Sequence, residues 1–205
     1  MIHVETFELG LLIQSNCYVV SKDGHALLID PGSKGRSVQK YIEENRFIVD
    51  AILLTHGHFD HCAGVDHFVK EYDCPVYIHP LDAQLLQDPK LNFSADFAPL
   101  VVATKPHLFQ SGKQTIGAFE VDVKDAPGHT EGSCLLLIEQ CMFCGDVLFQ
   151  GSIGRTDLIG GSNTKMIQSL RMLKQLPNDY FVYPGHGPAT KLSEEIKYNY
   201  YLQSV

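Results

Sequence analysis

Three histidines and an aspartate lie within six positions of the string LLTHGHFDH, residues 53–61, and they limit the possible folds more than any other feature of the chain. They follow the apolar run DAILLT at 50–55, which predicts a buried strand. Side chains two apart in an extended chain point to the same side. His56 and His58 can therefore bind one ion together, and the fold must supply a pocket where this strand ends.

The next two ligand-type residues follow a change of chain direction. A helix is predicted from Gly64 to Tyr72, because apolar residues recur there with helical spacing. Asp60 and His61 then fall in the turn or in the first helical residues. We expect them to face a second position near the ion of the first two histidines.

Three further ligand-type side chains each follow a predicted strand at a turn that contains glycine. KDAPGHTEG places His129, CMFCGD places Asp146, and YFVYPGHG places His186. Glycine allows a sharp turn and a close approach of the loop to an ion. Seven candidate ligands are too many for one tetrahedral zinc with an open position, so they suit two ions. A buried polar network without metal is the alternative, but its desolvation would cost much free energy.

The order of the predicted elements indicates two packed sheets with helices outside, and not an alternating parallel sheet. Strands are predicted at NCYVVS, HALLID, DAILLT, PVYIH, FEVDVK, SCLLLIE, CMFCGD and YFVYPG. Helices are predicted around Val38–Ile42, over 65–72, over 166–173, and from Ser193 as an N-cap. We expect one domain of residues 1–205. The segments 88–107 and 150–163 show little periodicity, and we expect them to wall the substrate site as loops.

Charge and composition favour a small-molecule substrate. The net charge is −8, and no basic cluster is longer than two residues, so neither nucleic acid nor an anionic membrane is an expected partner. The start MIHVETFELGLLIQ has no signal-peptide features, and no apolar run of about 18 residues exists to span a bilayer. We expect a cytoplasmic protein.

The remaining cysteines and histidines fit structural roles. Cys141 and Cys144 form a C-x-x-C that half a zinc site or a redox pair would also show, but strand residues three apart point to opposite faces. We expect buried, reduced thiols there, and Cys62 in the core. The histidines outside the ligand pattern are expected to be structural or at the surface: His3, His25, His67, His79 and His107.

The series H-x-H-x-D-H, P-G-H, G-D and P-G-H resembles the metallo-β-lactamase superfamily, and within it the glyoxalase II-like hydrolases. The match runs in order from NCY near residue 17 and IDPG at 29–32 to YPGHG at 183–187. The resemblance implies an α+β fold, a four-layer αβ/βα sandwich with a dinuclear metal site at one edge. It implies that Asp146 bridges the ions, one held by His56, His58 and His129, the other by Asp60, His61 and His186.

The same resemblance implies that Asp30 of IDPG steadies the metal ligands, although an aspartate after a strand is also an ordinary turn residue. Two divalent ions are implied, with zinc expected and iron or manganese as alternatives. Zinc lowers the pKa of bound water from 15.7 to about 7, so a metal-bridging hydroxide can attack a carbonyl. Asp60 and Asp146 are the expected catalytic carboxylates.

Thioesters such as S-lactoylglutathione, or a related conjugate of a small thiol, are the expected substrates, because a thiolate leaves with little acid assistance. GSIGRTDL matches a basic loop of the family, so Arg155 is predicted to meet a substrate carboxylate; otherwise it is a surface residue of a turn. In glyoxalase II a C-terminal helical extension contacts glutathione. This sequence ends soon after PGHGPATKL, so that mode of binding is not expected.

Two other functions stay open. GRTD also resembles persulfide dioxygenases of the superfamily, whose single iron would correspond to His56, His129 and Asp146. A metal-binding protein without turnover is the third hypothesis. Thiol carrier, acyl group, physiological metal and oligomeric state stay open at this point.

Overall fold

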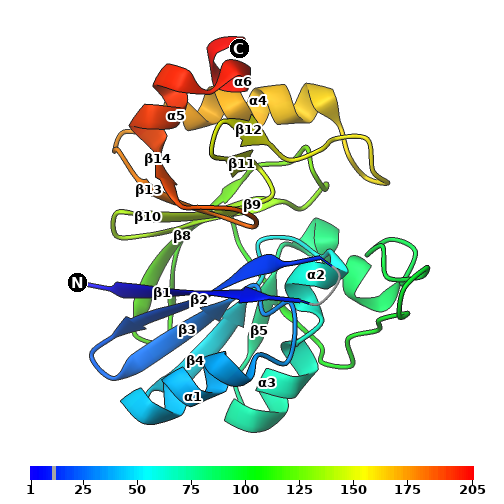
Figure 1. Cartoon of the computed structure of the whole chain (residues 1–205), viewed down its shortest axis with the longest axis vertical. Helices are drawn as coiled ribbons and strands as arrows, with labels where there is room; N and C mark the ends of the chain where they lie inside the picture. Colours follow the sequence, from blue (N-terminus) through cyan, green and yellow to red (C-terminus); the bar gives the residue numbers. More distant parts are fainter. Residues whose placement is uncertain (11–12) are drawn as a thin grey trace.

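Two β-sheets pack face to face, and helices cover the outer face of each, in the computed structural model, which describes residues 1–10 and 13–205 (Figure 1). Helices α1 and α3 lie below the sheets in this view, and α4, α5 and α6 lie above them. This is the expected αβ/βα sandwich, and the prediction of fold class is confirmed.

The first sheet contains antiparallel and parallel pairs. Its strand order is β1-β2-β3-β4-β5-β6; β1, β2 and β3 pair antiparallel, and β3 to β6 pair parallel. The strands are β1 (His3–Leu9), β2 (Ser15–Lys22), β3 (His25–Ile29), β4 (Ile48–Leu53), β5 (Val76–Ile78) and β6 (His107–Leu108).

The second sheet is also mixed, with the order β14-β13-β10-β9-β8-β7 and one parallel pair, β10 with β13. Its strands are β7 (Gly112–Ile116), β8 (Phe119–Asp125), β9 (Cys134–Ile138), β10 (Cys141–Gly145), β13 (Phe181–Pro184) and β14 (Thr190–Lys191). A separate hairpin joins β11 (Leu148–Phe149) to β12 (Ser152–Ile153).

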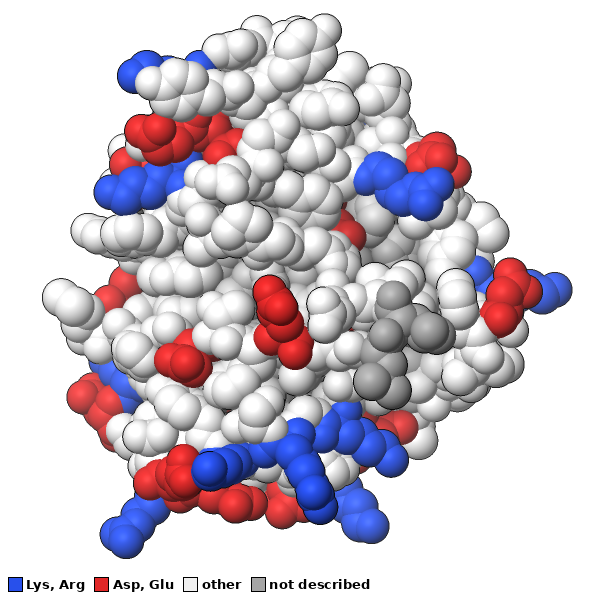
Figure 2. Space-filling view, viewed as in Figure 1, with Lys and Arg blue, Asp and Glu red and all other residues white. Residues whose placement is uncertain are grey.

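Six α-helices and two short 3-10 helices are described. The first half has α1 (Arg36–Asn45), α2 (Phe59–Cys62), α3 (Val65–Tyr72), η1 (Pro80–Asp82) and η2 (Leu85–Gln87); the second has α4 (Asn163–Leu173), α5 (Leu192–Tyr198) and α6 (Tyr200–Gln203). In the described residues no helix is long and apolar enough to cross a membrane. Acidic and basic side chains are interspersed over the face in Figure 2.

Three apolar clusters fill the spaces between the four layers. Strand β2 shows how one strand serves two of them: Cys17 and Val19 face the helices α1 and α3, whereas Tyr18 and Val20 face the second sheet. The third cluster lies between the second sheet and α4 to α6. Because both faces of the inner strands are buried, they read as nearly continuous apolar runs, which explains why these strands were predictable.

The strands that the sequence did not predict lie at sheet edges. β1, β6, β7 and β14 end the two sheets, and their exposed residues are polar or charged in part, so the apolar signal is weak. The hairpin strand β12 also lies within 150–163, which was expected to be irregular. These segments are extended because each pairs with a neighbouring strand, and not because one of their faces is apolar.

The predicted N-cap of the last long helix was wrong. Helix α5 begins at Leu192 with Lys191 as N-cap, so Ser193 already lies within the first turn. The Ser193 amide and hydroxyl instead donate to the Asp179 carboxylate, each at 2.9 Å. A carboxylate from the loop between α4 and β13 therefore caps this helix end.

The cysteines agree with the prediction. All six are free and buried. Cys141 belongs to the cluster between the sheets and Cys144 to the cluster under α4, so the two thiols point to opposite faces of β10. Burial raises the pKa of Cys144 to about 12. Cys62 lies in the core beside α3, as expected.

Candidate metal centre

The ends of strands β4, β8, β10 and β13 bring the predicted ligands to one edge of the sandwich. The segment after β4 carries His56 and His58 and leads directly into α2, whose single turn carries Asp60 and His61. The other three ligands come from loops after strands of the second sheet: His129, Asp146 and His186.

Three groups of three side chains form there; one contains Asp30, His56 and His61, and the other two match the predicted ligand sets. The candidate ligand atoms of His56, His58 and His129 lie within 4.8 Å of one another, and those of Asp60, His61 and His186 do the same. In the first group His58 Nδ1 is 2.8 Å from His129 Nε2. The structure therefore brings together the side chains that the sequence assigned to each ion; their role as ligands stays a prediction.

Asp146 lies between the two groups. Its Oδ2 atom is 3.4 Å from His129 Nε2 and 3.4 Å from His186 Nε2, and its Oδ1 atom is 3.5 Å from His61 Nε2. One carboxylate thus faces histidines of both groups, which is the position that a bridging ligand requires.

Several polar atoms of the candidate ligand side chains have no hydrogen-bond partner among the described residues. They are buried, and they belong to four side chains of the centre: His56 Nε2, His58 Nε2, His61 Nε2 and Asp146 Oδ1. Buried polar groups without partners cost free energy, and native proteins rarely leave several of them together. Imidazole nitrogens and carboxylate oxygens are ordinary ligands of divalent metals, so these residues fit a metal centre.

The two histidine groups differ in electrostatics. Burial lowers the pKa of His58 to about 3, and neighbouring His129 acts in the same direction. Burial also opposes a charge on His61, but the carboxylates of Asp60 and Asp146 outweigh it and raise its pKa to about 9. Burial likewise opposes the charge on His186, and hydrogen bonds to Asp146 and Asp60 raise its pKa to about 11. The carboxylates therefore draw positive charge into the second group.

In three histidines of the centre, the ring nitrogen that points away from it, Nδ1, donates a hydrogen bond to a specific acceptor; we call it the outer nitrogen, and Nε2 the inner one. His61 Nδ1 donates to Asp30 Oδ2 at 3.1 Å, His129 Nδ1 to the Arg155 carbonyl at 2.8 Å, and His186 Nδ1 to the Gln14 carbonyl at 2.6 Å. Such bonds fix the tautomer and orient the inner nitrogen. Asp30 also accepts from the Thr55 amide and hydroxyl, so the contacts expected of it are present.

Asp82 makes a set of contacts that sequence reasoning missed. Its carboxylate accepts from the Gly57 amide at 3.0 Å, the Thr130 hydroxyl at 2.7 Å and the Gly132 amide at 2.7 Å. It therefore ties the loop of His56 and His58 to the loop of His129. The sequence does contain a local indication of this role: Asp82 belongs to HPLD, which follows a predicted strand and so places a carboxylate next to a turn.

The last P-G-H sequence needs glycine at position 185, because the loop passes close to the side chains of the centre. A Cβ atom at Gly185 would collide with Asp146 Oδ1 and with the ring of His61. The expectation that glycine lets this loop approach the centre closely agrees with this geometry.

A cavity of about 460 Å³ opens over the ligands. Residues of both segments that were expected to wall the site line it, among them Phe93 and Phe97 from 88–107 and Arg155 and Leu158 from 150–163. The Arg155 guanidinium donates to both carboxylate oxygens of Asp157, at 2.7 and 2.8 Å. Arg155 thus lies at the cavity, but its charge is already paired.

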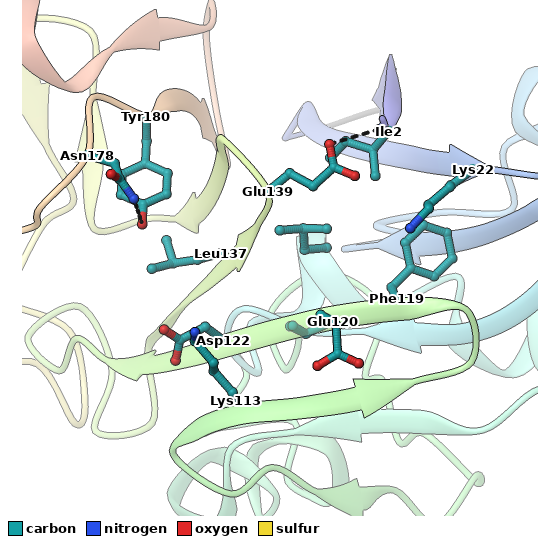
Figure 3. Close-up of a pocket in the computed structure, with 12 residues that line it drawn as sticks. Ile2, Lys22, Lys113, Phe119, Glu120, Asp122, Leu137, Glu139, Asn178 and Tyr180 are labelled. Atoms are coloured by element: carbon teal, nitrogen blue, oxygen red, sulfur yellow. Dashed lines mark hydrogen bonds between the residues drawn. The ribbon is translucent and has the colours of Figure 1, made fainter.

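A second cavity, of about 420 Å³, lies against β8 and β9, and Figure 3 shows its mixture of charged and apolar side chains. It includes Lys22, Lys113 and Glu120, and none of its described lining residues is a histidine or cysteine. Within the described part of the chain, every group of three or more metal-ligand side chains lies in the centre at the strand ends. The remaining five histidines belong to none of these groups.

The chain is similar to proteins of known sequence over nearly its whole length. Residues 10–186 match the family model described as the metallo-beta-lactamase superfamily. A probable metallo-hydrolase, YqgX of Bacillus subtilis (strain 168), is 39% identical over 93% of each chain. Hydroxyacylglutathione hydrolase GloC of Haemophilus influenzae is 31% identical over 93% of this chain and 94% of its own.

Solved structures give the same architecture. BLEG-1, a B3 metallo-beta-lactamase, superposes with a TM-score of 0.92 at 38% identity, over 98% of this chain and 99% of its own. TTHA1623, solved in a di-iron-bound form, has a TM-score of 0.84 at 35% identity, over 96% and 99%. ETHE1 from Myxococcus xanthus has a TM-score of 0.71 at 25% identity, over 91% and 78%.

Proposed function

The chain belongs to the metallo-β-lactamase superfamily, and on that premise we propose that it is a hydrolase that uses two divalent metal ions to cleave thioesters of small thiols. The observation that carries the proposal is the pair of three-residue groups joined by Asp146 at the floor of one cavity. In the proposed centre, His56, His58 and His129 would hold one ion and Asp60, His61 and His186 the other, with Asp146 placed between the two groups. Zinc is the metal we propose, although the di-iron form of a relative keeps iron as an alternative.

The bound ions would polarise a carbonyl oxygen and lower the pKa of water towards 7. The protein itself supplies orientation. Asp30, Arg155 and Gln14 hold the Nδ1 atoms of His61, His129 and His186, and the Nε2 atoms of these rings face the Asp146 carboxylate. Asp60 and Asp146, both close to His186 Nε2, supply the negative charge that keeps cations there.

In the proposed reaction, the oxygen of water adds to the acyl carbon and the carbon–sulfur bond breaks. One proton of the water goes to the thiolate, and the other goes to the new carboxylic acid, which releases it to solvent at neutral pH. A thioester suits this site because a thiol of pKa near 8.5 leaves without a strong acid. The likeness to GloC, whose name describes hydrolysis of an acylglutathione, supports this substrate class. Arg155 stays the candidate for one substrate carboxylate, since Asp157 occupies only two of its five N–H groups.

The test is metal content combined with activity. Protein purified without added metal is analysed for zinc, iron and manganese, then stripped and reloaded with each. We expect two ions per chain and release of thiol from S-lactoylglutathione or other small thioesters. His58→Ala should lower kcat/KM by more than about 100-fold, because it removes a ligand and not only a residue that orients one. His3→Ala, at an exposed histidine outside the centre, is the control.

Two outcomes would replace the proposal with another function. One iron per chain and oxygen uptake with glutathione persulfide would make the protein a dioxygenase, which the resemblance of the GRTD loop to persulfide dioxygenases supports. Cleavage of a chromogenic cephalosporin without thioesterase activity would make it a lactamase, as the name of BLEG-1 suggests. Two bound ions with no turnover of any of these compounds would leave a metal-binding protein.

A further inference from the structure

Six apolar side chains form the rim of the cavity over the metal centre, and we call them the apolar collar. Five candidate ligands form its floor: His58, Asp60, His129, Asp146 and His186. The collar comes from several separate parts of the chain, and its members are Ile13, Phe59, Phe93, Phe97, Phe149 and Leu158.

The collar rings border the ligands directly. The Phe93 ring lies 5.1 Å from the His58 ring, and the Phe149 ring lies 6.0 Å from the His186 ring, both edge to face. Phe97 stacks on Phe59 at 5.6 Å. A substrate whose reacting bond lies at the floor must therefore pass its neighbouring groups along these rings.

The collar also leaves apolar surface open to water. Phe97 is 56% exposed and Ile13 is 40% exposed. Apolar surface at the mouth of a cavity is typical of ligand sites, because the ligand covers it.

Hydrogen bonds hold the collar segment in place. Phe93 has a φ of 64°, in the left-handed region that a bulky residue rarely adopts, and such strain concentrates at functional sites. The fully buried Asn92 beside it donates to the Leu85 and Leu100 carbonyls at 2.9 and 3.1 Å, and its own carbonyl accepts from the Phe59 amide at 3.0 Å. The backbone thus holds Phe93 against His58 at an energetic cost.

The charge of the rim does not suit a substrate with several ionised groups. Among the described residues that line this cavity, Arg155 is the only lysine or arginine, and its ion pair with Asp157 leaves it able to bind one substrate carboxylate at most. Glutathione carries two carboxylates and an ammonium group. Pairing them would require more free charges than the described part of the rim contains.

We propose that the apolar collar binds an uncharged alkyl or aryl group of the substrate, so that the protein selects apolar thioesters over those that carry the charged arms of glutathione. This inference rests on the proposed thioesterase function and specifies its substrate class.

The kinetic test uses thioesters of one uncharged thiol, N-acetylcysteamine, with acetyl, butanoyl and hexanoyl groups. In the zinc-loaded protein, kcat/KM should rise at least about tenfold from acetyl to hexanoyl, because each methylene that enters the collar leaves water. The hexanoyl compound should also be hydrolysed faster than S-lactoylglutathione. Phe97→Ala and Phe149→Ala should flatten the rise with chain length, because kcat/KM for the hexanoyl compound falls more than kcat/KM for the acetyl compound. Phe181→Ala, at an exposed phenylalanine away from this cavity, should keep the full rise.

A binding measurement separates the collar from the reaction. Calorimetry of the zinc-loaded protein should give a dissociation constant for 2-phenylethanethiol at least about tenfold lower than that for glutathione, and Phe97→Ala should remove most of this difference. A flat acyl series, faster hydrolysis of S-lactoylglutathione, or equal affinity for the two thiols would overturn the inference. If no thioester is hydrolysed, the proposed function fails, and the thiol affinities still decide whether the collar selects apolar groups.

Discussion

Asp30 combines an unusual backbone conformation with three hydrogen bonds. It has a φ of 49° at the end of β3, and its carboxylate accepts from Thr55 twice and from His61. Asparagine tolerates the left-handed region, so Asp30→Asn adds little backbone strain. It offers fewer acceptor sites for the same donors and no charge beside His61.

We therefore expect Asp30→Asn to bind the ion of the Asp60, His61 and His186 group about 10- to 100-fold more weakly, with the ion of the other group unaffected. Competition with a chelator would show one weak and one tight site per chain. Asp23→Asn is a matched control, because Asp23 is exposed and has a φ of 51°. Equal weakening of both ions would contradict this role for Asp30.

Asp82 links two ligand loops through buried hydrogen bonds. Asp82→Asn keeps the volume but places an amide group against three donors, from Gly57, Thr130 and Gly132. We expect the free energy of unfolding to fall by about 1–3 kcal/mol, since at least one buried donor loses its acceptor. Urea denaturation measures this change. Asp73→Asn, at an exposed helix end, should change stability little, and an equally small effect at Asp82 would refute the linking role.

At the scale of elements, helices α5 and α6 support the hairpin β11–β12. The buried Asn199 donates to the Phe149 and Ser152 carbonyls at 3.3 and 3.0 Å and to Glu195 at 2.9 Å. Glu195 in turn accepts from the Gly151 amide at 2.8 Å. Because Phe149 belongs to the collar, these contacts connect the last helices of the chain to the rim of the cavity.

Asn199→Ala removes the donor of two hairpin carbonyls. We expect faster amide hydrogen exchange over 148–153 and a loss of about 1–3 kcal/mol in the free energy of unfolding. Exchange in β2 to β4 should stay unchanged. Asn45→Ala, at an exposed asparagine that bonds only within its own helix, is the control. Unchanged exchange in the hairpin would show that Asn199 does not support it.

The elements differ in how well the sequence predicted them. Inner strands such as β3 and β9 are apolar on both faces, and this local property appears in the sequence. Edge strands such as β1 and β7 carry exposed polar residues, and only their neighbours make them strands. The cap of α5 was misassigned because Asp179, which accepts from Ser193, is separated from it by a strand.

At the scale of the whole molecule, the metal centre joins both sheets, so bound ions should stabilise the complete fold. At a free metal concentration of about 100 times the dissociation constant, binding adds about 2.7 kcal/mol, which corresponds to a rise in Tm of about 5–10 °C for a chain of this size. Calorimetry of stripped and reloaded protein measures it. A chelator should reverse the rise, and His58→Ala should reduce it; equal Tm values with and without bound metal would contradict the expectation.

The assignment of residues 1–205 to one domain and the cytoplasmic location stay predictions, as does the identity of zinc. By itself the sequence indicated the seven candidate ligands, because five lie at glycine-containing turns after apolar strands and Asp60 and His61 follow two of them directly, and these are local signals. Only the tertiary structure decided that the seven converge, that Asp82 links their loops, and that Phe93, Phe97 and Phe149 surround them. The physical reason is that contacts between distant residues depend on how the layers pack, and no periodicity within one segment encodes that packing.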